Sequence, residues 1–373
     1  RQAVAYVQRE GAKPADSFID PRFSFLFGHL PLRQYRILQQ GMDALIEEKV
    51  DDERALGSPL GLLRSHNGMM ELLPTGAAVS SKVKRLDLGQ ADRGISTYLT
   101  QEAALLLRSD CESMLLQRIV RPEWASSIGR DRYGLFADFK IEQTRQRMRW
   151  INPGSFLMGT SEDVGRENEQ PQHKVVLRQG FWLAETVCTQ LLWQTIIGGN
   201  NSHFSGEERP VERVSWSDVQ EFLGILNERV PGLDVVLPTE AQWEYACRAG
   251  TKSAYSLGDE IIPGQANFHN ITTEDVKSFE RNDWGLYQMH GNVWEWCRDG
   301  GREYGEMDVV DPVGVEGEGR IVRGGSWRDT VEMLRSSLRH YRPCDTRSGG
   351  VGFRLAIGPE PTCQETSAVN SGD

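Results

Sequence analysis

The chain has 373 residues, of which 39% are hydrophobic and 25% are charged, and its formal net charge is −11 at pH 7. This length provides ample core and predicts two domains or one elaborated domain. The acidic balance argues against a nucleic-acid partner, which would favour a basic face. No apolar run approaches the length of a membrane-spanning helix, so no membrane partner is expected.

The cysteines are scattered along the chain without paired spacing. In a chain of this size such usage favours the reducing cytoplasm, and residues 1–10 lack the pattern of a signal peptide. Cys247 and Cys297 stand among apolar and aromatic residues and are predicted to be buried free thiols. The six positions are Cys111, Cys188, Cys247, Cys297, Cys344 and Cys363.

Residues 1–144 are predicted to form a partly helical N-terminal region of unknown role. The segments 33–51 and 99–120 have helical apolar periodicity. The segment 59–74 is interrupted by Gly and Pro, and it is predicted to be irregular and poor in strands. We expect this region to couple the rest of the chain to a partner or to a second copy.

Two short amphipathic helices are predicted farther along the chain. Thr239 and Gln242 form a capping-box pattern directly after Pro238, which ends any earlier element. Ser217 and Gln220 form a second such pattern. The apolar residues that follow it share one helical face, namely Val219, Phe222, Leu223 and Leu226.

Short apolar or alternating runs bounded by Gly and Pro are predicted to be strands. They lie at 173–177, 320–323 and 352–357. Long irregular connections and 38 glycines accompany them. This combination favours a small, loop-rich α+β fold with short strands and two short helices over a helical bundle or a doubly wound sheet.

Eight sequence landmarks in order resemble the sulfatase-modifying-factor (formylglycine-generating enzyme) family, a branch of the C-type-lectin fold. The resemblance implies a C-type-lectin-like domain over 145–357 and a flexible tail over 358–373. The landmarks are INPGSFLMG at 151–159, EQPQH at 169–173, FWL at 181–183, TQLLW at 189–193, PVERVSW at 210–216, LPTEAQWEYACRAGT at 237–251, NDWGLYQMHGNVWEWC at 282–297, and RGGSW at 323–327 with GFRL at 352–355.

The resemblance also locates the two working cysteines of the enzymes, which hold copper and activate oxygen. At the matching positions this chain has Asp329 and Leu334, and Cys344 is the only thiol between 323 and 354. A carboxylate and an isobutyl group cannot perform thiol chemistry. We therefore predict a binding scaffold without oxidase activity, with no catalytic residues and no required cofactor.

A calcium loop is a further implication of the family resemblance. The family pattern supplies backbone oxygens at Gly291 and Val293 and a carboxylate at Glu295. Gln288 stands where the family usually has Asp or Asn. Calcium prefers an all-oxygen ligand set of this kind, so a structural calcium ion is expected here. The alternative is that Asn292 and Glu295 simply form hydrogen bonds with the loop backbone.

Within 323–354, residues of structural type alternate with twelve residues that resemble the variable region of proteins diversified by retroelements. In those systems adenines of a template are randomised, which excludes Glu, Lys, Gln, Met and Trp, and none of the twelve belongs to these types. The mixture of Tyr, His, Arg and small residues is also typical of adaptable binding surfaces. The twelve candidate contact residues are Arg328, Asp329, Thr330, Leu338, His340, Tyr341, Arg342, Cys344, Thr346, Ser348, Gly349 and Gly350.

The remaining residues of the same stretch are predicted to hold the backbone, and we call them the frame residues. Among the candidate contacts, Tyr341 and Arg342 are expected to be the energetic anchors, and 348–350 the adaptable rim. The frame residues are Arg323, Trp327, Met333, Leu334, Arg335, Ser336, Arg339, Arg347, Val351, Gly352, Phe353 and Arg354.

These patterns predict a non-catalytic receptor-like protein that binds a ligand, expected to be a protein, through a diversified surface. A static regulatory or interaction module of a bacterial conflict or signalling system is one alternative. An enzyme is another, either an oxidase of the family type or one with a pocket near Asp329 and Arg335. Glu240 and Glu244 resemble an acid pair, but at i, i+4 on a helix we expect them to be structural and close to the surface.

Overall fold

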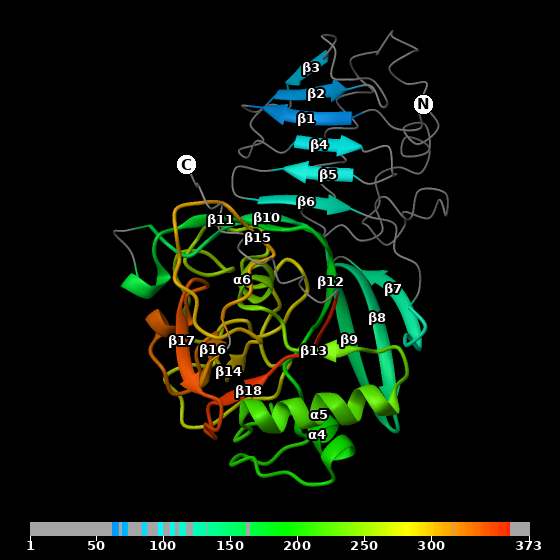
Figure 1. The fold of residues 1–373 in the computed structure, drawn as a ribbon, viewed down its shortest axis with the longest axis vertical. Coiled ribbons are helices and arrows are strands. Elements are labelled where there is room, and N and C mark those ends of the chain that lie inside the picture. Colours follow the sequence, from blue (N-terminus) through cyan, green and yellow to red (C-terminus); the bar gives the residue numbers. More distant parts are fainter. Residues whose placement is uncertain are drawn as a thin grey trace, which may run out of the picture.

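The computed structural model describes residues 122–131, 133–161, 165–315 and 317–358, together with six short strands upstream of them. In these residues several small sheets and few helices are joined by long connections, so the architecture belongs to the mixed α+β class (Figure 1). None of the described helices is both long and apolar enough to cross a membrane.

The upstream strands correct two predictions. Strands occupy parts of 59–74 and 99–120, so the irregular segment and the helix predicted there are wrong. Short apolar runs such as 105–107 satisfy helical and strand periodicity alike, and antiparallel pairing with neighbouring strands decides between them. The helix predicted over 33–51 lies outside the described residues. The six strands are β1 (Leu62–His66), β2 (Met69–Leu73), β3 (Lys84–Asp87), β4 (Ser96–Leu99), β5 (Leu105–Arg108) and β6 (Glu112–Leu116).

Two six-stranded sheets follow in the topology. One has the order β15-β11-β10-β6-β5-β4 and contains β10 (Gly154–Met158), β11 (His173–Leu177) and β15 (Val309–Val310). The strand predicted at 173–177 is therefore confirmed with the same bounds. The other has the order β13-β19-β12-β9-β8-β7, with β7 (Ser127–Asp131), β8 (Gly134–Ile141), β9 (Thr144–Ile151), β12 (Phe181–Ala184), β13 (Val235–Val236) and β19 (Ala356–Ile357).

Three α-helices are present in the described part of the chain, one more than predicted for residues 145–357. They are α4 (Gln190–Ile197), α5 (Trp216–Arg229) and α6 (Glu240–Arg248). The Thr239 capping box of α6 is confirmed. The cap of α5 was predicted two residues too late, because Ser215 and Asp218 form its capping box. The helix α4, capped by the Thr189 side chain, was missed.

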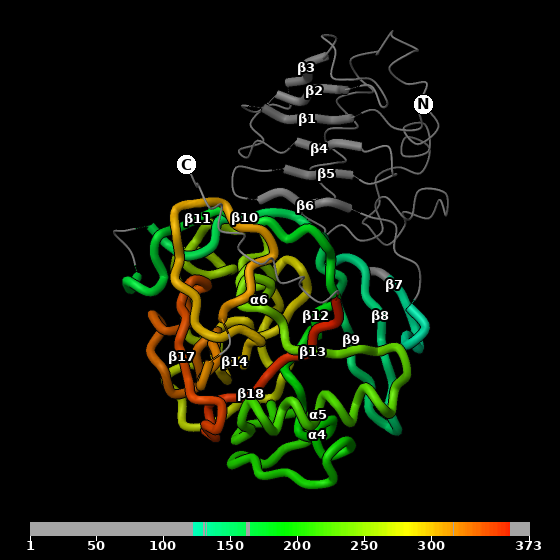
Figure 2. Tube along the Cα trace, in the orientation of Figure 1, coloured from blue at the N-terminus to red at the C-terminus, as the bar shows by residue number. Residues whose placement is uncertain are grey.

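Aromatic packing joins these helices to the C-terminal part of the chain. Trp193 of α4 stacks on Phe222 of α5 with 5.1 Å between ring centroids. Phe353 meets Phe222 edge-on at 5.3 Å and Trp193 at 6.0 Å. Since burying one such side chain contributes about 1.5–3 kcal/mol, this cluster fixes the strand that carries Phe353. The path of the chain past α5 can be followed in Figure 2.

A four-stranded sheet with the order β17-β16-β14-β18 carries the stretch of interest. Its central strands β14 and β16 pair antiparallel, while β14 and β18 run parallel. The strand predicted at 320–323 is confirmed as β16, whereas the one predicted at 352–357 is divided between two sheets, because β18 ends before Arg354 and β19 begins at Ala356. The strands of this sheet are β14 (Trp294–Trp296), β16 (Gly319–Arg323), β17 (Arg339–Pro343) and β18 (Val351–Phe353).

Two short 3-10 helices flank this sheet. The segment η2 (Glu167–Glu169) contains a buried glutamate, and η3 (Val331–Leu334) lies within the stretch between β16 and β17. Glu169 accepts hydrogen bonds from Arg335 at 2.8 Å and from Ser337 at 2.7 Å. A segment far upstream in sequence therefore helps to hold the 323–354 stretch in place.

Candidate functional site

Buried ion pairs hold the two ends of the 323–354 stretch. Arg323 is fully buried, and its guanidinium contacts the Glu244 carboxylate and donates to the carbonyls of Ser337 at 2.7 Å and Ser336 at 3.0 Å. Arg354 is also fully buried and forms two hydrogen bonds of 2.8 Å with Glu295. Because leaving a buried charge unpaired is costly, these pairs fix the backbone at both ends.

The acid pair on α6 is part of this buried network. Glu240 accepts two hydrogen bonds from Arg339, at 2.7 and 2.6 Å. Glu244 forms ion pairs with both Arg248 and Arg323. Burial by itself raises the pKa of Glu244, but the charges of the two arginines outweigh burial and hold its pKa below the usual range. The structural role predicted for these glutamates fits, whereas their predicted position near the surface is wrong, since both are buried.

A buried histidine supports the middle of the stretch. His290 Nδ1 lies 2.7 Å from the carbonyl oxygen of Leu334, while its Nε2 lies 3.0 Å from the backbone N–H of Ser256. A carbonyl can only accept and an amide N–H can only donate, so the imidazole is neutral with its proton on Nδ1. Burial lowers the pKa of His290 to about 4, in agreement with that neutral form.

Side chains that stabilise the fold occupy the positions of the family's two cysteines in this chain. Leu334 is fully buried and packs with Tyr255 and Ile261. Asp329 accepts hydrogen bonds from the Ser326 amide and hydroxyl and from Trp294 Nε1 at 2.8 Å. The Asp329 carboxylate therefore ties the turn at 326–329 to β14, and neither side chain supplies a thiol.

The thiols in the described part of the chain lie elsewhere. Cys247 and Cys297 are buried and unpaired, which confirms the prediction for them. Burial raises the pKa of Cys247 to about 12, so its thiol stays protonated near neutral pH. Cys344 is partly exposed, and its nearest described partner is Arg320, 3.7 Å from the sulfur.

The one carboxylate of the predicted calcium loop is already paired with an arginine. Both carboxylate oxygens of Glu295 accept from Arg354, and one also accepts from Trp243 Nε1 at 2.7 Å. Gln288 uses its amide nitrogen to donate to the Asp275 carbonyl at 3.0 Å. The guanidinium thus already neutralises the one anionic ligand. The remaining candidate oxygens are neutral, namely the backbone oxygens of Gly291 and Val293 and the Oε1 atom of Gln288, which is buried without a hydrogen-bond partner among the described residues. A calcium ion would have to displace Arg354 from Glu295 to gain a carboxylate ligand.

The twelve candidate contact residues divide by exposure. Leu338 is only 1% exposed, so its placement on the surface was wrong, and Gly350 is buried as well. Arg328, Thr330 and Tyr341 are exposed. The remaining seven residues are half-exposed, namely Asp329, His340, Arg342, Cys344, Thr346, Ser348 and Gly349.

Strand β17 presents its side chains to two different faces. Successive residues of a strand point to opposite sides, so His340 and Arg342 share one face and Tyr341 lies on the other. The ring of Tyr341 covers Gly319, where an added Cβ would lie 2.6 Å from the ring. The two predicted anchors, Tyr341 and Arg342, therefore do not belong to one contact surface.

The face that carries His340 and Arg342 also includes parts of the neighbouring loop. His340 packs against Trp294 with 5.9 Å between ring centroids. Arg328 donates to the Ser348 hydroxyl at 3.1 Å. Trp327 Nε1 donates to the Gly349 carbonyl at 2.9 Å, which joins the loop after β16 to the loop before β18. We call Arg328, His340, Arg342, Ser348 and Gly349 the basic face.

Positive charges meet on the basic face. Burial lowers the pKa of Arg342, and the nearby charge of Arg328 lowers it further. Burial also lowers the pKa of His340, followed by the charges of Arg342 and Arg166. Arg166 was missed by the sequence analysis, because it lies far upstream and nothing in the spacing connects it to β17.

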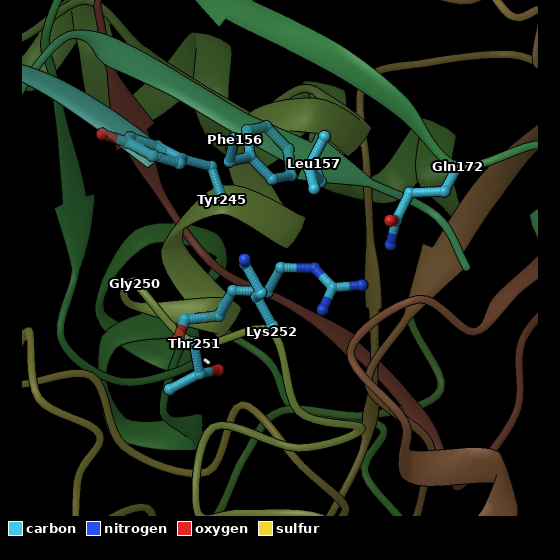
Figure 3. Close-up of a pocket in the computed structure, with 8 residues that line it drawn as sticks. Phe156, Leu157, Gln172, Tyr245, Gly250, Thr251 and Lys252 are labelled. Atoms are coloured by element: carbon cyan, nitrogen blue, oxygen red, sulfur yellow. Dashed lines mark hydrogen bonds between the residues drawn. The ribbon is translucent and has the colours of Figure 1, made fainter. Parts of the chain in front are cut away.

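A pocket in the described residues lies elsewhere, where α6 meets β10 (Figure 3). Phe156 and Tyr245 line it, together with Arg248, which is already bound to Glu244 and to the Gly159 carbonyl. Neither Asp329 nor Arg335 lines this pocket, so it does not provide the concave site expected of an enzyme with unfamiliar chemistry.

Comparisons with known proteins agree with this fold. A formylglycine-generating enzyme from Streptomyces coelicolor is 35% identical over 187 residues, which cover 44% of this chain and 57% of that protein. The serine/threonine-protein kinase pkn1 of Chlamydia caviae is 30% identical over 242 residues, 57% of this chain and 38% of that protein. The chain thus spans less than two thirds of the length of these relatives.

Inactive relatives and solved structures are similar as well. The inactive Cα-formylglycine-generating enzyme 2 of Bos taurus is 30% identical over 200 residues, 48% of this chain and 59% of that protein. The structure of Treponema denticola variable protein 1 is similar with a TM-score of 0.55 and 26% identity, covering 60% of this chain and 98% of that one. PvdO from Pseudomonas aeruginosa, with a TM-score of 0.51 and 24% identity over 60% of this chain and 98% of that one, shows the shared fold alone.

These findings confirm the predicted fold class, an α+β domain of the C-type-lectin-like, formylglycine-generating-enzyme type. The family contains enzymes and inactive members alike. Residues 135–358, more than half of the chain, match the sulfatase-modifying factor enzyme 1-like domain, and the chain therefore belongs to this family.

Proposed function

We propose that this protein is a non-catalytic receptor that binds a protein ligand through a diversified surface within 328–350. The observation that carries the proposal is the division of this stretch into two kinds of residue. Frame residues such as Arg323 and Arg354 are buried and paired. Candidate contacts such as Arg328 and Tyr341 are exposed.

The residues found where the enzymes of the family have their two cysteines support the proposal that this protein is non-catalytic. Asp329 and Leu334 replace the two cysteines, and both side chains serve the fold. A structure named as a variable protein shares this fold at 26% identity, which supports diversification. Binding of a protein fits a stretch that displays an exposed Tyr on one side of β17 and arginines with small residues on the other.

The direct test of diversification is the sequence around the gene. We expect a near-repeat of the segment that encodes 323–353, differing at adenines and lying beside a reverse transcriptase gene. If no such repeat exists, diversification is refuted, and a static regulatory or interaction module becomes the better account.

A protein-level test asks whether the surface tolerates diversity. A library that randomises Arg328, Thr330, His340, Arg342 and Ser348 should retain cooperative thermal unfolding in most members, since substitutions on exposed surface usually change stability by less than about 0.5 kcal/mol. A control library of equal size randomises the frame residues Arg323, Ser336, Arg339, Phe353 and Arg354 and should lose folded members. Equal losses in the two libraries would contradict a tolerant display surface.

A further inference from the structure

The arginines between 323 and 354 differ in whether they have a carboxylate partner. Each of the five frame arginines forms an ion pair, and the shortest N–O distance is 2.8 Å for Arg335, 2.6 Å for Arg339, 2.6 Å for Arg347 and 2.8 Å for Arg354, with Arg323 in contact with Glu244. Among the described residues, the two arginines at candidate contact positions have no such partner. These are Arg328 and Arg342, both on the basic face.

The environment of Arg342 is unfavourable for its charge. Its Nε is buried and has no hydrogen-bond partner among the described residues. Burial disfavours the charge of Arg342, and the charge of Arg328 adds to this effect. An anion bound at the basic face would offset the repulsion between the two guanidinium groups.

The nearest acidic side chain does not neutralise the pair. Asp329 lies near both Arg342 and His340. Its Oδ2 already accepts from the Ser326 amide, the Ser326 hydroxyl and Trp294 Nε1. This carboxylate therefore serves the backbone of the stretch and leaves a net positive charge on the face above it.

We propose that Arg328, Arg342 and His340 form a subsite for a carboxylate group on an acidic segment of the protein ligand. This inference rests on the proposed function and names the chemistry of the partner. A planar guanidinium matches a carboxylate with two parallel hydrogen bonds, and Arg is strongly represented among the residues that dominate binding energy.

The surroundings favour a protein over a nucleic acid as the source of the anion. The whole chain carries a net charge of −11, which repels a long polyanion. Trp327 and Phe204 meet edge-on at 5.3 Å beside the loop that carries Gly349. A small basic cluster next to aromatic residues suits one or two acidic side chains of a folded or extended protein partner.

The test uses the full chain and a fluorescein-labelled Gly–Ser peptide that carries two adjacent glutamates, with the same labelled Gly–Ser peptide without glutamate as the control probe. Fluorescence anisotropy at low salt should show binding of the glutamate peptide only. R342Q and R328Q should each weaken it at least about tenfold, the effect of losing one charge-assisted hydrogen bond. R347Q is the matched control, because it removes the same charge from an arginine that is already paired with Asp218.

The outcomes separate this inference from its competitors. Absence of glutamate-peptide binding, or equal weakening by R347Q, overturns the subsite. Tighter binding of a single-stranded oligothymidine that depends on Arg342 also overturns it and identifies a phosphate polyanion as the partner class. If the subsite fails while the gene carries a template repeat, the proposed function stands; if the peptide binds as expected without a repeat, only diversification falls.

A second readout reports directly on the basic face. An anion bound at the basic face would offset the charges that lower the pKa of His340. Titration by NMR should therefore show a higher pKa for His340 when the glutamate peptide is bound, with H340Q used to assign the signal. An unchanged pKa at saturating peptide would place the peptide elsewhere on the protein.

Discussion

The frame and the basic face lie within the same stretch of about thirty residues, yet their charges are handled in opposite ways. Arg323 and Arg354 are withdrawn from water and matched by glutamates. Arg328 is exposed and Arg342 half-buried, and neither has a carboxylate partner within the part of the chain that the structure describes. The difference teaches that folding and recognition depend on separate side chains, although these alternate along the sequence.

The largest effect is expected from breaking one buried pair of the frame. Arg354→Met leaves the buried Glu295 carboxylate without its guanidinium and should cost about 3–5 kcal/mol. Urea unfolding followed by tryptophan fluorescence measures this loss. Arg347→Gln is the control, because its exposed pair with Asp218 is screened by solvent and should leave the midpoint nearly unchanged. Equal losses in both variants would erase the distinction between buried and exposed pairs.

A cavity at Leu338 tests whether this residue belongs to the buried frame, as the structure indicates, and not to the contact surface. Leu338 is 1% exposed and belongs with the frame, so Leu338→Ala should destabilise by about 2–5 kcal/mol. Leu257, which is 37% exposed, provides the matched control for the same substitution and should show a much smaller loss. A neutral Leu338→Ala variant would return this residue to the contact surface.

Acid should weaken the support that His290 gives to the frame. The pKa of His290 falls from 6.5 to about 4 on folding, because burial disfavours the charged ring. A lowered histidine pKa means that stability is complete above pH 6.5 and is lost as the pH falls from there toward 4, by on the order of 3 kcal/mol. The difference in unfolding free energy between the wild type and His290→Gln, measured across this pH range, gives the contribution of His290 protonation to stability. If the two proteins lose stability in parallel as the pH falls, His290 is not buried in its neutral form.

The smallest effect is expected from removing calcium. Since Arg354 already neutralises Glu295, the loop from Gln288 to Glu295 should gain nothing from the ion. The thermal unfolding midpoint should be the same in millimolar calcium and in excess chelator. A midpoint that rises with calcium would show that the cation competes successfully with Arg354 and would restore the expectation drawn from the family resemblance.

Local sequence patterns predicted much of the fold in the family-matched region. The Thr239 box and the strand at 173–177 were found because each depends on contacts within a few residues. The start of α5 was misplaced because Ser217 with Gln220 satisfies the same pattern as the true cap at Ser215. Short upstream strands were missed because their apolar runs satisfy helical and strand periodicity alike, and only pairing with other strands decides between them.

The sequence predicted which residues of the site stabilise the fold, but not which of the others share one exposed face. Four of the five frame arginines have the buried carboxylate partner that a structural role requires. Arg347 is instead exposed and pairs with Asp218 at the surface, so its predicted structural role was wrong.

Leu338 was misplaced because the sequence did not show that the residue before β17 faces the core. Tyr341 was grouped with Arg342 because the sequence did not show that β17 would display them on opposite faces. Arg166 joins His340 only through tertiary structure.

The two-sided display of β17 limits how many varied residues one ligand can meet. His340 and Arg342 face the same side, while Tyr341 rests over Gly319 on the other. Under the proposed diversification, a single partner would contact only the varied positions on its own side of the strand. The number of distinct binding surfaces that one partner can meet is therefore smaller than the number of sequence variants that the gene can produce. The same geometry would let the two sides of the strand acquire different specificities independently.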